Sequence, residues 1–418
     1  MRLKGEREKT VRNLDFRFFI AYFALRKTRN ANRAICNHLF NNEMMKELNN
    51  PFVIYGYKGE AYFCDRESET EKMLDALANE RNITLVAPRR MGKTGLIHHV
   101  FNRLDTGETK CFYVDIYATK SLNDFAAALA GKVIGGLDTL QEATWRKIQN
   151  FFGNFRPTLS YDQLTGAPVV SLDIAHGSEE PSIKQTFDYI AQSGKRCYIA
   201  IDEFQQILEY PETNVESLLR TFIQFMPNTY FIFAGSRRHV LQQMFTKANR
   251  PFFQSSQLMS LGPISEEKYL AWASAFFAQR GQQLPPALFH SIYERTGGTT
   301  WHINVVLNRL YSRKPQEITA NLLEDVVNEI IEEQTFAYEN VAHDLSRNEF
   351  NVLRAIAIDG VVTSPMSARF IARHKLTATS SVKTALRKLD AQQLVEQNIA
   401  TGGYYLHDPF MALWLRRL

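Results

Sequence analysis

The sequence lacks any run of the roughly eighteen apolar residues that a membrane-spanning helix needs. The longest apolar stretch near its start, residues 18–25, is short and lies between Arg17 and Arg26. Acidic residues precede this stretch, and basic residues follow it where a signal peptide has small ones. We therefore expect a cytoplasmic protein with no membrane partner.

Cysteine is also scarce. The four cysteines, Cys36, Cys64, Cys111 and Cys197, are scattered, and no two of them form a C-x-x-C pair. This spacing argues against a zinc site and against a disulfide framework. The sequence also has no internal repeat and no low-complexity segment.

What the sequence does have is length and an uneven distribution of charge. Its 418 residues are 45% apolar and 22% charged, which is typical of a globular protein of two or three domains. Residues 1–44 carry ten Lys and Arg against four Asp and Glu, and residues 345–418 carry ten against five, whereas residues 45–344 have a net charge of −6. The cationic C-terminal segment keeps nucleic acid open as a partner.

Residues 1–44 form a basic N-terminal extension whose composition differs from that of the rest of the chain. Two methionines, Met44 and Met45, stand at its end. The extension is either the product of a mis-assigned start codon or a real basic tail.

From residue 51, short apolar runs alternate with helical segments, and this alternation predicts a parallel α/β sheet. Two helices are expected, at residues 67–78 and 93–104. Residues 150–185 are rich in Pro, Gly and Ser, and we assign them to an insertion with a strand around residues 168–174. Strands of the main sheet are expected at residues 82–86, 111–116, 197–201, 230–234 and 258–261.

The C-terminal third of the chain is helical. Residues 264–340 predict a helical lid, and residues 345–418 predict three helices followed by two short strands that meet at Thr401, Gly402 and Gly403, which is a winged helix. The lid helices are expected at residues 266–279, 286–295, 300–311 and 320–338. Those of the winged helix are expected at residues 347–358, 367–373 and 380–394.

One motif lies between the first predicted strand and the helix at residues 93–104. It matches the phosphate-binding P-loop, G-x-x-x-x-G-K-[ST], except at its first position, where Ala87 replaces glycine. In such a loop the backbone N–H groups and the helix N-terminus bind phosphate, Lys93 reaches the β- and γ-phosphates, and Thr94 places its hydroxyl on Mg²⁺. The predicted ATP-binding residues of the loop are Ala87, Pro88, Arg89, Arg90, Met91, Gly92, Lys93 and Thr94.

A second motif follows about 110 residues later, where the apolar run at residues 198–201 ends in two carboxylates. This is the Walker B arrangement. Asp202 is expected to hold Mg²⁺, directly or through water, and Glu203 to act as the general base that polarises the attacking water.

A third polar site follows the predicted strand at residues 230–234. Ser236 is expected to contact the γ-phosphate as a sensor and so to assist catalysis. The next two residues, Arg237 and Arg238, either sense phosphate as well or lie on the surface.

These motifs, in this order, resemble the predominantly archaeal and bacterial ATPase family within the STAND and AAA+ group of P-loop proteins. The resemblance covers residues 45–418 and implies a P-loop ATPase core at residues 45–263, a helical lid and a winged helix. It is carried by residues 62–67 (YFCDRE), 88–94 (PRRMGKT), 201–205 (IDEFQ), 234–236 (AGS) and 404–410 (YYLHDPF) with Trp414.

The resemblance also implies a place for the nucleotide base and for a lid sensor. Residues 63–67 are expected near the adenine, with Arg66 either contacting ATP or forming a local salt bridge at the start of a helix. The lid has no arginine where many relatives have a sensor, because residues 297–302 read GGTTWH. His302 either takes that place or is a packed core histidine.

We interpret the chain as a slow ATPase that acts as a molecular switch. MgATP binds between the core and the lid, hydrolysis resets the switch, and the winged helix or an oligomer contact reads its state. One alternative is a DNA-binding regulator with a structural nucleotide. Basic residues and hydroxyls at residues 375–388 favour it, while the wing at residues 396–405 carries no basic residue. A second alternative is a phosphotransferase, although Glu203 beside Asp202 favours water as the acceptor.

Overall fold

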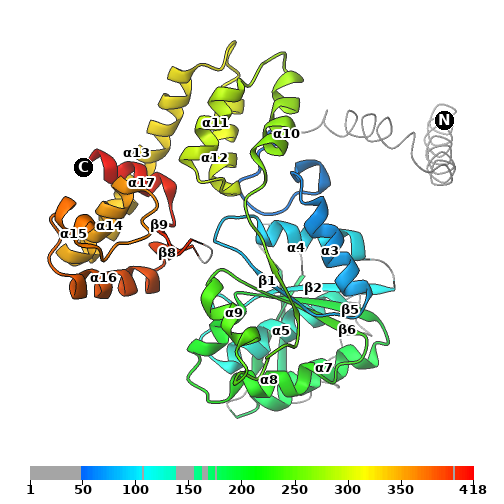
Figure 1. The fold of residues 1–418 in the computed structure, drawn as a ribbon. Coiled ribbons are helices and arrows are strands. Elements are labelled where there is room, and N and C mark those ends of the chain that lie inside the picture. The colour runs from blue at the N-terminus through cyan, green and yellow to red at the C-terminus, as the bar shows by residue number, and fades with distance from the viewer. Residues whose placement is uncertain (1–48, 106–107, 138–154, 162–167, 175–176, 399–400) are drawn as a thin grey trace, which may run out of the picture. The chain divides into compact units, whose positions relative to one another are not determined.

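The structure is a computed structural model that describes residues 49–105, 108–137, 155–161, 168–174, 177–398 and 401–418. Residues 52–418 form one compact unit (Figure 1). The N-terminal extension predicted at residues 1–44 lies outside the described residues. Every helix within the described ranges is too short or too polar to cross a membrane.

A parallel sheet of five strands, in the order β2-β5-β6-β1-β7, lies at the centre of the N-terminal half. All its pairings are parallel, as the alternation of apolar runs and helices predicted. Each predicted strand matches an observed one, with ends that differ by at most two residues. The strands are β1 (Ile83–Val86), β2 (Thr109–Asp115), β5 (Arg196–Asp202), β6 (Thr229–Gly235) and β7 (Gln257–Ser260).

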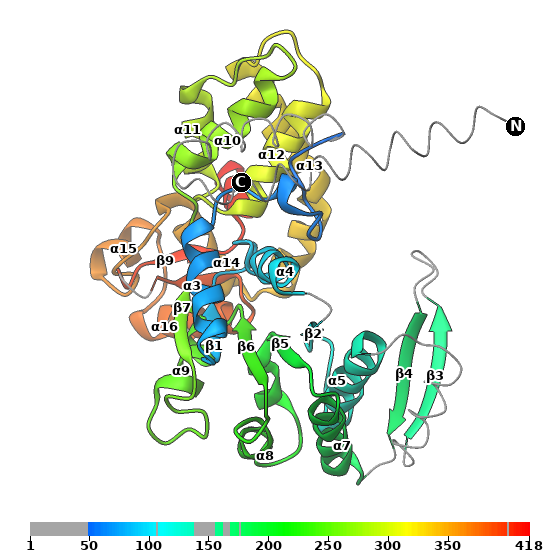
Figure 2. The same ribbon diagram turned by 90° about the vertical axis from the view of Figure 1, so that its right-hand side faces the viewer.

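Helices cover both faces of this sheet (Figure 2). On one face lie α3 (Glu67–Ala78) and α4 (Lys93–Leu104), whose predicted bounds are confirmed to the residue. On the other face buried side chains of four further helices form a second apolar core. These helices are α5 (Leu122–Leu137), α7 (Glu179–Gln192), α8 (Val215–Ile223) and α9 (Arg238–Thr246).

The predicted insertion contains an antiparallel pair of strands, β3 (Phe155–Tyr161) and β4 (Pro168–Ile174). The strand expected around residues 168–174 is therefore confirmed. The insertion was wrongly extended to residue 185, because α7 begins at Glu179 and packs Ile183 into the core beneath the sheet. Pro181 and Ser182 resemble loop residues in sequence, but proline is tolerated in the first turn of a helix.

Four helices follow the sheet, where the helical lid was predicted (Figure 1). The last of them runs six residues beyond the predicted end at Tyr338. Its final two turns carry few buried side chains, so the apolar period that marks a helix fades there. The helices are α10 (Glu266–Ala278), α11 (Pro286–Arg295), α12 (Thr300–Ser312) and α13 (Ala320–Asp344).

The C-terminal segment is a winged helix, as predicted. Its first helix begins at a capping box formed by Ser346 and Glu349. The last helix was not predicted: it begins after Asp408, which caps it, and buries Trp414. The elements are α14 (Arg347–Asp359), α15 (Ala368–Arg373), α16 (Thr379–Ala391), β8 (Val395–Gln397), β9 (Tyr404–Leu406) and α17 (Pro409–Arg417).

Candidate nucleotide-binding site

Three adjacent strands of the sheet bring the predicted site residues together. The strands β5, β6 and β1 are neighbours, and their carboxyl ends lie at the same edge because they are parallel. The P-loop follows β1, the carboxylates of Asp202 and Glu203 stand at the end of β5, and Ser236 follows β6. Residues more than a hundred positions apart in the sequence thus share one site.

The P-loop has left-handed backbone conformations at two positions. Arg90 has φ 64° and Gly92 has φ 90°, and Gly92 is the N-cap of α4. Ala87, where the motif has glycine, is not among the described residues with positive φ. The departure from the motif therefore costs no backbone strain, because only a positive φ would require glycine at that position.

The ammonium group of Lys93 lies between the two acidic residues. Its Nζ is 2.6 Å from Oδ1 of Asp202 and 3.1 Å from Oε1 of Glu203. Lys93 and Asp202 are both buried. Burial alone would raise the pKa of Asp202, but the nearby Lys93 charge, with hydrogen bonds from Lys93, Tyr113 and the Glu203 amide, lowers it. Asp202 is therefore a carboxylate at neutral pH.

The second oxygen of Asp202 meets two hydroxyl groups. Thr94 Oγ1 lies 3.2 Å and Tyr113 Oη 2.5 Å from Oδ2, and both donate to it. A threonine hydroxyl and an ionised carboxylate are both hard oxygen ligands, which Mg²⁺ prefers. The other ligands of Mg²⁺ in such sites are water and phosphate oxygens. Thr94 and Asp202 therefore fit the predicted metal ion, and Tyr113 orients the carboxylate.

Glu203 is held by hydrogen bonds from two neighbouring residues, in addition to its ion pair with Lys93. Its backbone is left-handed, with φ 57°, at the start of the 3-10 helix η3 (Phe204–Glu209). Its Oε2 accepts from the backbone N–H of Ser236 at 3.2 Å, from the Ser236 hydroxyl at 2.9 Å and from Gln205 Nε2 at 2.5 Å. Ser236, the predicted sensor, therefore contacts the predicted general base.

Two further arginines were predicted to bind ATP, Arg89 of the P-loop and Arg66, which precedes α3. Arg89 Nε lies 3.5 Å from Ser236 Oγ, so Arg89 is at the site. Arg66 is buried and donates to Glu69, to the Met91 carbonyl at 3.3 Å and to the Gly262 carbonyl at 2.7 Å. The local salt bridge at the start of a helix is therefore confirmed, because Arg66 precedes α3 and lies 2.9 Å from Glu69. Contact of Arg66 with ATP remains a prediction, and its guanidinium also binds the P-loop through the Met91 carbonyl.

Arg90 connects the P-loop to the lid and to the winged helix. Its carbonyl accepts from the Trp301 N–H at 3.0 Å, and its guanidinium lies over the Trp301 ring, 4.2 Å from the centroid. The same guanidinium lies 2.8 Å from Oδ2 of Asp408 and 3.0 Å from Nε2 of His302. His302 is fully buried and its pKa is lowered, chiefly by burial. It therefore accepts from Arg90 as a neutral imidazole.

A second connection starts two residues after Ser236. Arg238, the first residue of α9, forms an ion pair with Glu396 of β8, and Glu396 also accepts from the Tyr405 hydroxyl at 2.9 Å. Its neighbour Arg237 pairs with Glu209 at 2.7 Å. Arg238 therefore binds the wing, a role that neither interpretation from the sequence included.

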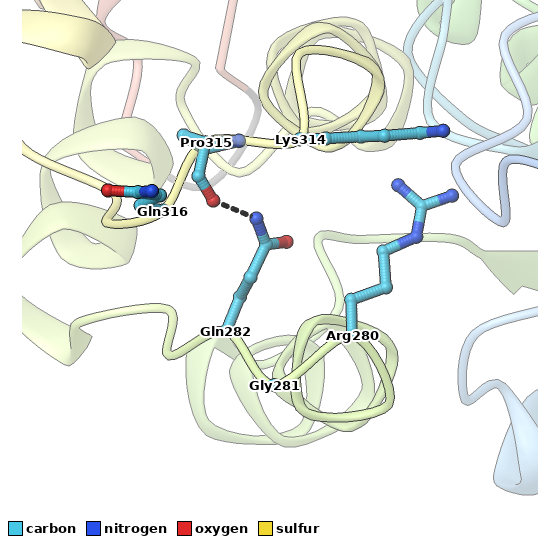
Figure 3. A pocket seen from close by; sticks show the side chains of 6 residues that line it. All are labelled: Arg280, Gly281, Gln282, Lys314, Pro315 and Gln316. Atoms are coloured by element: carbon cyan, nitrogen blue, oxygen red, sulfur yellow. Dashed lines mark hydrogen bonds between the residues drawn. The ribbon is translucent and has the colours of Figure 1, made fainter.

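A separate hollow of about 510 Å³ lies between the ends of α10 and α12 (Figure 3). Gln282 Nε2 donates to the Pro315 carbonyl across it, and Arg280 Nη1 donates to the Tyr311 carbonyl at 2.7 Å. None of the residues that line it belongs to the P-loop or to the carboxylate pair. The hollow is lined by Arg280, Gly281, Gln282, Lys314, Pro315 and Gln316.

Sequence reasoning missed Tyr113 and gave no role to Gln205 or Asp408. Tyr113 lies on β2 at an ordinary apolar position, and only the pairing of β2 with β5 places it beside Asp202. Gln205 and Asp408 occur in motifs that the resemblance used. Asp408 binds Arg90, 318 residues before it, whereas Gln205 binds Glu203, only two residues before it, through a contact that the local sequence does not indicate. For Tyr113 the missing signal is the order of the strands in the sheet, which cannot be read from the sequence.

Comparisons with known proteins agree with this geometry. A family model described as an ATPase domain predominantly from Archaea matches residues 63–306, and a model described as a probable winged helix domain matches residues 336–417. The first match spans more than half of the chain. The chain therefore belongs to this family of ATPase domains, as the motifs indicated, and is an ATP-binding protein of the P-loop ATPase type.

Individual relatives are distant. An uncharacterized ATP-binding protein of Methanocaldococcus jannaschii is 23% identical over 297 residues, which are 65% of this chain and 74% of that protein. The Walker-type ATPase of Pyrococcus abyssi has a TM-score of 0.60 at 16% identity and covers 88% of this chain and 99% of its own. The ORC2 protein of Aeropyrum pernix, in ADPNP and ADP complexes, has a TM-score of 0.57 at 16% identity, with 89% and 96% covered. These structures share the fold.

The Tyr113 hydroxyl generates a first prediction. Replacing Tyr113 by Phe removes a hydrogen bond to an ionised carboxylate, an interaction of about 1.5 to 3 kcal/mol. We expect ATP binding with Mg²⁺ to weaken about tenfold, because Asp202 loses its orientation, and binding in EDTA to stay within about twofold. Calorimetric titration of ATP measures both. Tyr230→Phe, on strand β6 of the same sheet but away from the site, is the control. Equal weakening with and without Mg²⁺ would contradict the assignment.

Proposed function

We propose that this member of the archaeal ATPase-domain family binds MgATP, hydrolyses it slowly and acts as a STAND-type molecular switch whose nucleotide state is read by the winged helix. One observation carries the proposal. Two of the loops that would contact the phosphates also carry, or lead directly to, an arginine that forms an ion pair with the winged helix. Arg90 of the P-loop pairs with Asp408, and Arg238, just after the loop that follows β6, pairs with Glu396.

Hydrolysis requires few groups, and each has a candidate. The backbone of the P-loop, Lys93 and the N-terminus of α4 bind the phosphates. Thr94 and Asp202 would hold Mg²⁺, which would supply positive charge against the phosphate oxygens. Glu203 accepts a proton from the water whose oxygen attacks the γ-phosphorus, and the bond to the β–γ bridging oxygen breaks to leave ADP and phosphate.

In the proposed switch, the γ-phosphate competes with the two carboxylates for the same side chains. Lys93 is bound to both carboxylates and Ser236 is bound to Glu203, yet both are the groups that the γ-phosphate would attract. A phosphate that draws Lys93 and Ser236 away must shift the loops that carry them. Arg90 lies three residues before Lys93 and Arg238 two residues after Ser236, so such shifts reach Asp408 and Glu396 directly.

The two connections differ in strength. The side chains of Arg90 and Asp408 are 42% and 25% exposed, so this pair contributes at most about 1 kcal/mol. The side chains of Arg238 and Glu396 are 18% and 10% exposed, and removing one member of such a buried pair costs about 3 kcal/mol or more. The Glu396 contact therefore holds the wing, while the Asp408 contact is weak enough to open.

The switch would act on a further partner. A protein partner or a second copy of the chain would read the position of the winged helix, and we propose a cytoplasmic location for this assembly.

Hydrolysis gives the central test. We expect the full chain to convert ATP to ADP and phosphate with Mg²⁺, because a water-polarising carboxylate adjoins the phosphate-binding lysine. Glu203→Gln should bind ATP with little change but lower kcat at least about a hundredfold, and Lys93→Ala should lose binding as well. Phosphate release and equilibrium ATP binding measure these effects. A parent that binds ATP without turnover would refute the ATPase, and a phosphorylated acceptor beside ADP would favour a phosphotransferase.

The switch has its own test, by hydrogen exchange of backbone amides. We expect an ATP analogue and ADP to give different exchange rates in β8 and α17. Asp408→Asn combined with Glu396→Gln should abolish this difference, because asparagine still caps α17 while both ion pairs are lost. Glu333→Gln, which breaks the Arg309–Glu333 pair on the lid, is the matched control. A nucleotide-dependent difference that survives in the double variant would refute this coupling.

A second candidate function is DNA binding through α16. Its outward side carries Ser380, Lys383, Thr384 and Arg387 at the spacing of one helix face, and all four are exposed. The helix has a single acidic residue, Asp390, near its end. The carboxylate of Glu349 on the adjacent helix α14 is paired with Lys388. Such a face suits phosphate contacts along a duplex.

DNA binding is checked by titrating labelled duplex at several salt concentrations. If α16 binds duplex DNA, Lys383→Ala with Arg387→Ala should lower affinity at least about tenfold and reduce the salt slope by about 2, because two phosphate contacts disappear. Lys72→Ala with Lys247→Ala removes the same charge elsewhere on the surface and should change neither. No binding by the parent, with or without ATP, removes this candidate.

A further inference from the structure

The amide of Gln205 lies against the predicted general base in a confined space. Gln205 is 3% exposed and its Nε2 donates to Oε2 of Glu203 over 2.5 Å. Its Oε1 has no hydrogen-bond partner among the described residues. The reverse orientation of the amide would place that oxygen against the carboxylate, so the charge of Glu203 fixes which way the amide faces.

Gly235 creates the space that this amide occupies. A Cβ atom at Gly235 would lie 2.0 Å from Gln205 Oε1 and 3.0 Å from its Cδ. These distances are far below contact, so any side chain at the end of β6 would displace the amide. The φ of Gly235 is not positive, and glycine is therefore required here by close approach and not by backbone conformation.

The two oxygens of Glu203 have different surroundings. Oε2 accepts from Gln205 Nε2 and from both the amide and the hydroxyl of Ser236, whereas Oε1 is paired with Lys93. In the proposed function, Lys93 and the Ser236 hydroxyl turn to phosphate. The donors that remain on the carboxylate, the Gln205 amide and the Ser236 backbone N–H, are both on Oε2.

We infer that Gln205 is the positioning residue of the ATPase: it anchors Oε2 of Glu203 so that Oε1, once Lys93 leaves it, is the oxygen that faces the attacking water. A carboxylate held by one oxygen keeps the direction of the other, and a proton acceptor that is misdirected by a fraction of an ångström is a poor base. Without the amide, only the Ser236 backbone N–H, 3.2 Å from Oε2, still holds that oxygen, and the carboxylate is directed less firmly. This inference rests on the proposed hydrolysis.

The test compares two adjacent glutamines of the same 3-10 helix. Gln205→Met keeps the size of the side chain and removes the donor. We expect kcat to fall about 10- to 100-fold, while KM and the equilibrium ATP affinity stay within about twofold. Gln206 donates to the Thr119 carbonyl instead, so Gln206→Met should leave kcat within about twofold. Circular dichroism and thermal unfolding verify that both variants are folded.

A double-mutant cycle separates positioning from a general structural role. Gly235→Ala should lower kcat to about the level of Gln205→Ala, because the new methyl group displaces the amide. In the Gln205→Ala background the same substitution should cost less than about twofold, since the obstructed side chain is gone. Additive losses would show that Gly235 acts independently of Gln205 and would overturn the inference.

The possible failures are distinguishable. If the parent does not hydrolyse ATP, the proposed function and this inference fall together. If the parent hydrolyses ATP and Gln205→Met retains kcat, or loses ATP affinity in proportion to kcat, the inference alone is wrong.

Discussion

The buried ammonium group of Lys93 between Asp202 and Glu203 is the interaction on which the rest of the site depends. Two carboxylates at the end of one strand repel each other, and burying them without a cation would be costly. Lys93 balances that charge from the first residue of α4, so the P-loop and the end of β5 must stay together. Four further groups hold the oxygen of each carboxylate that Lys93 does not contact. Thr94 and Tyr113 donate to Oδ2 of Asp202, and Ser236 and Gln205 donate to Oε2 of Glu203.

In the proposed switch, the same arrangement would carry a change at the phosphates to the winged helix. The charged site is satisfied by its own side chains, so a phosphate must displace some of them. The displaced groups belong to short loops that also carry Arg90 and Arg238, whose guanidinium groups bind the winged helix. The hydrogen bond from Trp301 to the Arg90 carbonyl adds the lid to this connection. A fold with these contacts has little freedom to rearrange one part alone.

Much of the fold could be predicted because local signals were strong. The helix α4 begins after glycine at a P-loop and carries an apolar face, and its predicted bounds were correct. The local signal failed where it was weak. The first turn of α7 contains a proline and a serine, α13 ends in two turns with few buried side chains, and α17 is a short helix after the wing. In each case packing against distant elements stabilises a helix that its own sequence marks poorly.

The sequence by itself determined the class of fold and the order of the main strands, the lid and the winged helix, and it identified the P-loop and the carboxylate pair, because these follow from residue types at fixed local spacing. The tertiary structure alone decided which residues support that chemistry. Tyr113 meets Asp202 because β2 pairs with β5, Gln205 reaches Glu203 because Gly235 has no side chain, and Arg90 finds Asp408 across more than three hundred residues. Contacts of this kind depend on strand order and on close packing, neither of which leaves a periodic trace in the sequence.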